Sequence, residues 1–60
     1  MLKYYVMAFG AEIARFNSLA DACDWAKNQS DKLQSGWFNV HDNEDKRLLF
    51  AAFDKGERVI

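Results

Sequence analysis

The sequence predicts an α+β domain with the order ββαββ, in which one helix packs on one face of a single, mostly antiparallel four-stranded sheet. One helical pattern begins at Ser18, and a run of strand-forming residues interrupted by turn-forming residues lies on each side of it. With 60 residues, half of them hydrophobic and none of them proline, the chain is expected to fold as one domain over residues 1–60.

The first hairpin is expected within the first sixteen residues. Residues 2–9 are rich in Tyr, Val and Phe, which suit a pleated and partly buried surface. Gly10 can adopt positive φ at low steric cost, so a turn at residues 10–12 would join this run to a shorter strand over residues 13–16.

The helix begins after Ser18, a favourable N-cap, and Asp21 stands where a capping box places its acid. Lys32 suits the last turn, and Gly36 is the expected stop signal. The side chains at helical spacing are mostly small, so the helix should lie close to the sheet. They are Leu19, Ala22, Cys23, Ala26, Ser30 and Leu33. Trp25 borders this stripe and is expected to seal the edge of the core.

The second hairpin is predicted from strands over residues 37–41 and 47–53, joined by a polar turn at residues 42–46. A short tail at residues 58–60 is available for edge pairing. With Val40 opposite Leu48, one set of side chains should face the helix: Phe38, Val40, Leu48, Phe50 and Ala52. The alternate set should face away from it: Trp37, Asn39, His41, Arg47, Leu49, Ala51 and Phe53.

The face away from the helix should be polar if it simply met water, and the pattern indicates otherwise. Both alternating sets of residues 2–9 are mainly apolar, and so is much of the second set in the last hairpin. An exposed apolar face is typical of an interaction surface, although the C-terminal tail could instead cover part of it. Partner contact is expected from Tyr5, Trp37, His41, Arg47, Leu49 and Phe53.

Three occupants of that face are considered, and a partner protein is the first. A second copy of the chain is another, because a 60-residue domain buries only ~60% of its unfolded surface. Single-stranded RNA is the third, since Tyr5, Trp37 and Phe53 could stack bases beside cationic Lys3 and Arg47. The net charge of −1 and the absence of a glycine-aromatic RNA-binding motif disfavour nucleic acid.

No pattern in the chain indicates an enzyme, a cofactor or a metal site. Cys23 is expected to be a small core residue and His41 a surface imidazole beside Asp42. The acidic turn at residues 42–45 lacks the ligand spacing and the glycine of a calcium loop. The apolar start is too short to span a bilayer and has no basic leader, so a cytoplasmic protein without membrane contact is expected.

Three stretches, residues 15–22, Trp25-Ala26 and residues 37–42, resemble a pattern seen in short phage and prophage reading frames. Those frames encode compact hairpin–helix–hairpin proteins, mostly of unknown function, and the resemblance covers most of the chain. It implies a small soluble regulator or inhibitor that contacts a host or phage macromolecule and blocks or redirects it. The resemblance assigns no functional residue.

Overall fold

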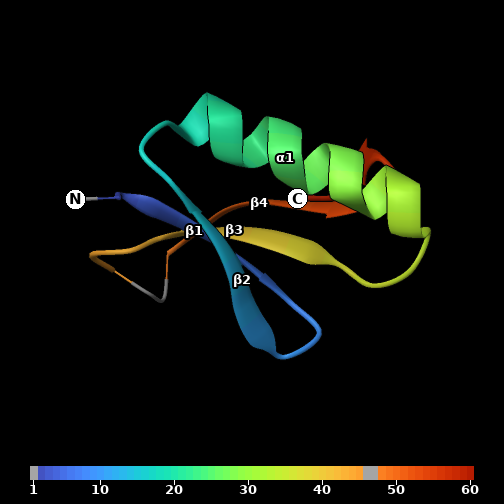
Figure 1. The fold of residues 1–60 in the computed structure, drawn as a ribbon, viewed down its shortest axis with the longest axis horizontal. Helices are drawn as coiled ribbons and strands as arrows, with labels where there is room; N and C mark the ends of the chain where they lie inside the picture. Colours follow the sequence, from blue (N-terminus) through green and yellow to red (C-terminus); the bar gives the residue numbers. More distant parts are fainter. Residues whose placement is uncertain (1, 46–47) are drawn as a thin grey trace.

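The computed structural model describes residues 2–45 and 48–60 of the chain. Helix α1 (Leu19–Leu33) lies across one face of a single five-stranded sheet (Figure 1). The strands are β1 (Tyr4–Ala8), β2 (Ala11–Phe16), β3 (Phe38–Asp42), β4 (Leu49–Asp54) and β5 (Glu57–Arg58).

The strands lie in the order β2-β1-β3-β4-β5, and every neighbouring pair is antiparallel. The predicted α+β class, the one helix and the single antiparallel sheet are therefore confirmed. The predicted count of four strands is wrong, because Glu57 and Arg58 add a fifth strand at the β4 edge. No helix in residues 2–45 or 48–60 has the length and apolar content needed to cross a membrane.

The first hairpin is tighter than the sequence predicted. Its loop is Phe9-Gly10, where φ is 55° and 77°, and Ala8 pairs directly with Ala11. Positive φ at both loop residues is typical of the mirror-image turn that matches the twist of two antiparallel strands. The second strand therefore begins two residues before the predicted start at residue 13.

Helix α1 begins as predicted, because the Asp21 backbone N–H donates to Ser18 Oγ at 3.3 Å. It ends at Leu33, and the residue that stops it is Gln34 and not the expected Gly36. Gln34 takes a left-handed φ of 56°, and its N–H donates to the Ser30 carbonyl at 3.0 Å. The Gln34 side chain also donates to the Asp31 carbonyl at 2.6 Å, which satisfies another backbone group of the last turn.

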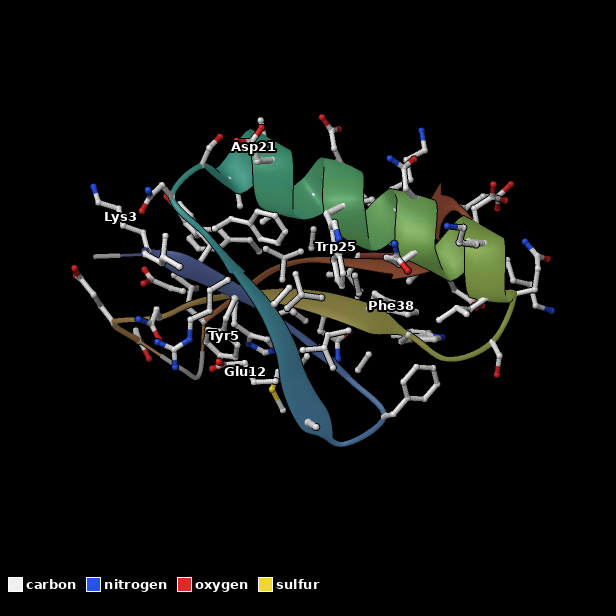
Figure 2. All side chains as sticks on the ribbon, in the orientation of Figure 1. Lys3, Tyr5, Glu12, Asp21, Trp25 and Phe38 are labelled. Atoms are coloured by element: carbon white, nitrogen blue, oxygen red, sulfur yellow. The ribbon has the colours of Figure 1, made fainter. Side chains whose placement is uncertain are left out.

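The core lies between α1 and the sheet. The helix contributes Ala22 and Ala26, both fully buried, and their small size lets the larger strand side chains fill the space below. The sheet contributes Val6, Ala8, Phe38, Val40, Ala51 and Phe53. Trp25 closes one border of this core, with its ring 5.8 Å from that of Phe16 and 6.4 Å from that of Phe38 (Figure 2).

The register of the last hairpin differs from the predicted one. Val40 pairs with Ala51 and not with Leu48, and Phe38 pairs with Phe53. A bulge next to this pair then sets Leu49 opposite His41. Two of the three positions arise because the hairpin pairs further along the chain, with Asp42 N–H donating to the Leu48 carbonyl at 3.2 Å, and the bulge adds the third.

An odd shift in register moves side chains to the opposite face of a sheet. Ala51 and Phe53 therefore face the helix, where the alternate pattern had placed them on the far side. Ala52, expected in the core under α1, lies on the far side instead, since it pairs with Asn39.

Ser30 ties the helix to the turn between β4 and β5, and this contact generates a stability prediction. Its fully buried hydroxyl donates to the Lys27 carbonyl at 2.9 Å and accepts the Gly56 N–H at 3.0 Å. Ser30→Ala should lower the free energy of unfolding by about 1–2 kcal/mol, because the Gly56 donor loses its acceptor. Urea denaturation measures the change, and Ser35→Ala in the exposed loop is the control. Equal effects of the two substitutions would contradict this role for Ser30.

Candidate functional site: the outer face of the sheet

The side of the sheet opposite α1 carries two rows of side chains that run across the strands. Since Val6 and Ala8 point into the core, Tyr5 and Met7 on the same strand point away from the helix. Side chains of directly paired residues share a face, which extends each position into a row. One row is Arg15, Tyr5, His41 and Leu49, and the other is Glu12, Met7, Asn39 and Ala52. We call these eight residues the outer face.

In Figure 2, Tyr5 and Glu12 lie on the side of the sheet opposite Trp25. The row that contains Tyr5 crosses four strands, from Arg15 on β2 to Leu49 on β4. The outer face is thus a surface shared by most of the sheet, and it is formed by residues far apart in the chain.

A bulge in β2 places both of its charged residues on the outer face. Val6 pairs with Ala14 and Met7 pairs with Glu12, so Ile13 is an extra residue. Residues three apart on a regular strand would face opposite sides, and the extra residue brings Glu12 and Arg15 to the same side. Their ion pair is bidentate, with Arg15 Nε 2.6 Å from Glu12 Oε2 and Nη2 3.1 Å from Oε1.

Tyr5 forms the floor of the outer face. Its side chain is only 5% exposed, and its ring stacks on that of His41 with centroids 5.2 Å apart and planes 15° apart. Burial and, to a smaller extent, the Glu12 carboxylate raise the pKa of the Tyr5 phenol above its ordinary value of 10.0.

Two polar atoms on β3 are buried without a hydrogen-bond partner among the described residues. They are Asn39 Oδ1 and His41 Nδ1, and the two side chains stand next to each other on the outer face. A buried polar atom without a hydrogen-bond partner costs about 1–3 kcal/mol, so native proteins contain few of them. The neighbouring Asp42 carboxylate accepts the Glu44 backbone N–H at 2.8 Å.

The structure brings together three of the six contact residues that were proposed from the sequence. Tyr5, His41 and Leu49 lie in the same row. Phe53 does not join them, because the register shift turns it into the core, where it is 5% exposed. Trp37 precedes β3, lies outside both rows and is half-exposed. Arg47 lies outside the described residues.

Four residues of the outer face were not among the expected contact residues: Met7, Glu12, Arg15 and Asn39. Asn39 was expected to face away from the helix, and Met7 could have been found because it alternates with Tyr5 on its own strand. Glu12 and Arg15 could not, since only the bulge at Ile13 brings them to one face.

The described residues offer little other chemistry. No group of three His, Cys, Asp or Glu side chains in residues 2–45 and 48–60 could hold a metal ion, and these residues form no pocket. Cys23 packs against the core, and burial raises the pKa of its thiol, with Arg58 acting in the opposite direction.

Comparison with family models, with curated proteins and with solved structures gives no match to this chain. The geometry of the outer face is therefore the basis for assigning a function.

The raised pKa of Tyr5 predicts how the stability depends on alkaline pH. The unfolded chain ionises this phenol near its ordinary pKa of 10.0, before the folded protein does. The stability that Tyr5 contributes should therefore be intact below about pH 9 and fall as the pH rises through 10. Urea denaturation of the wild type and of Tyr5→Phe between about pH 8 and about pH 11 isolates this contribution as a difference. A difference that stays constant or grows above pH 10 would contradict the prediction.

Proposed function

We propose that this chain is a small, non-enzymatic binding module that holds a partner protein against its outer face. The observation that supports this most strongly is a pair of buried atoms, Asn39 Oδ1 and His41 Nδ1, which have no hydrogen-bond partner among residues 2–45 and 48–60. They lie on the one face of the sheet that α1 leaves uncovered. A protein surface that brings hydrogen-bond donors to this face would recover the free energy that these groups cost the free domain.

The rest of the outer face has the composition of a protein contact. Met7, Leu49 and the Tyr5 ring supply apolar area around Asn39 and His41. The ion pair between Glu12 and Arg15 lies at the border, on the outermost strand. An apolar centre with a charged rim is the usual arrangement in protein interfaces. The described residues form no pocket on this face, which suits a protein partner better than a small molecule.

The resemblance to short phage and prophage reading frames suggests the biological role of such a module. A 60-residue domain that presents one rigid face can block or redirect a larger protein simply by occupying its surface. We therefore propose a regulator or inhibitor of a host or phage protein, acting in the cytoplasm.

Single-stranded RNA is not favoured as the occupant. Stacking needs exposed aromatic rings, and two of the three expected rings, those of Tyr5 and Phe53, are each only 5% exposed. Trp37 alone of the three remains half-exposed, and it lies outside the outer face.

Asn39→Leu tests the proposal because stability and binding should change in opposite directions. Leu fills a similar volume without an unsatisfied acceptor, so the free energy of unfolding should rise by about 0.5–1 kcal/mol. Affinity for the partner should fall at least about tenfold. Urea denaturation measures the first change, and calorimetric titration with a partner isolated from host lysate measures the second.

Leu49→Glu should also abolish binding, and Leu33→Glu at the exposed end of α1 is its matched control. Unchanged affinity in both Asn39→Leu and Leu49→Glu would overturn the outer face as the binding site. Capture that disappears after nuclease treatment would replace the partner protein with a nucleic acid, and a second copy captured in its place would indicate a face-to-face dimer.

A further inference from the structure

The two edges of the sheet are not equivalent. At the β4 edge, β5 pairs with Phe53 and Asp54, and the Val59 N–H donates to the Ala52 carbonyl at 2.8 Å. The Arg58 guanidinium reaches the Phe50 carbonyl at 3.2 Å, so the outward backbone of β4 is largely satisfied. At the other edge, within the part of the chain that the structure describes, β2 pairs with β1 alone (Figure 1).

The β2 edge is a long and exposed one. β2 is six residues long, and 41% of the surface of Ile13 is exposed to solvent. An unpaired edge of this kind is a template for another strand, and proteins usually protect it with Lys, Pro or a bulge. β2 contains neither Lys nor Pro, and its bulge serves to align Glu12 with Arg15.

These two charges are complementary to a second copy of the same strand. If two β2 strands pair antiparallel over their whole length, Ala11 lies opposite Phe16 of the second copy and Glu12 lies opposite its Arg15. The register with the largest overlap therefore pairs Glu12 of each copy with Arg15 of the other. The two pairs are equivalent, because a two-fold axis relates the two copies. Opposite charges at directly paired positions stabilise a sheet, and like charges destabilise it.

The same register also matches the two faces of the sheet. Glu12 and Arg15 both point to the outer face, whereas Ala11 and Phe16 pair with Ala8 and Tyr4 of β1 on the helix side. A shift of one position would set Glu12 opposite Ala14 or Phe16, both of which point to the helix side. Of these registers, only the full-length one joins like face to like face, because paired side chains must point to the same side.

We propose that the β2 edge pairs with the β2 edge of a second copy of this chain, with Glu12 of each copy opposite Arg15 of the other. The two five-stranded sheets then form one continuous sheet, with both helices on one side and both outer faces on the other. This contact uses the strand edge and leaves the centre of the outer face open, so it does not depend on the proposed function.

A single pair of six-residue strands forms a small interface, so the dimer should be weak and depend on concentration. Sedimentation velocity from about ten micromolar to about one millimolar should show a rising dimer fraction for the wild type. Glu12→Arg and Arg15→Glu should each weaken association at least about tenfold, because like charges then face each other. The double swap, Glu12→Arg with Arg15→Glu, should restore it.

Lys27→Glu, on the exposed side of α1, is the matched control for the charge change in Arg15→Glu and should dimerise like the wild type. Thermal unfolding followed by circular dichroism checks that every variant is folded. Amide NMR of the wild type on dilution should shift the signals of residues 11–16 most.

A wild type that stays monomeric over the whole range would overturn this dimer. So would single reversals that associate as well as the wild type, a double swap that fails to regain association, or dilution shifts centred on Tyr5 and Leu49. None of these results bears on the affinity changes of Asn39→Leu and Leu49→Glu, so the dimer and the proposed function can fail separately.

Discussion

The close packing of α1 on the sheet is the contact on which the rest of the domain depends. Ala22 and Ala26 are fully buried, and so are the larger Val6, Phe38 and Val40 beneath them. Small side chains on the helix and large ones on the strands interdigitate, and the helix axis stays near the sheet. One 15-residue helix can cover only one face of five strands, so the same contact that builds the core leaves the outer face without a cover.

Two bulges decide what the outer face contains. The bulge at Ile13 brings Glu12 and Arg15 to one side of β2, and the bulge in the last hairpin sets Leu49 beside His41. Bulges cost ladder hydrogen bonds and re-aim side chains, which is why they are common near functional surfaces. The two bulges thus place the charged residues Glu12 and Arg15 at the border of the outer face and the apolar Leu49 near its centre.

The outer face also contains buried polar atoms that lower the stability of the domain. Asn39 and His41 each bury a polar atom that finds no partner among the described residues, in a chain too small to have a large reserve of stability. Elsewhere in the described chain, no other buried side-chain nitrogen or oxygen lacks a hydrogen-bond partner, and the hydroxyl of Ser30 is an example of a satisfied group. This contrast between a satisfied core and an unsatisfied face is the basis of the binding role that we propose for the outer face.

The sequence by itself determined the helix, its cap at Ser18, the two main hairpins and the α+β class, because caps, helical spacing and turn residues act over a few neighbouring residues. It also identified Tyr5, His41 and Leu49 as expected contact residues, although Leu49 lies beside His41 only because of the bulge between it and Ala51. The tertiary structure alone decided the bulge in the last hairpin, and with it the position of Phe53 in the core. Register depends on turn geometry and bulges, and one odd shift exchanges the two faces of a strand, so local patterns could not show which side of β4 meets the helix.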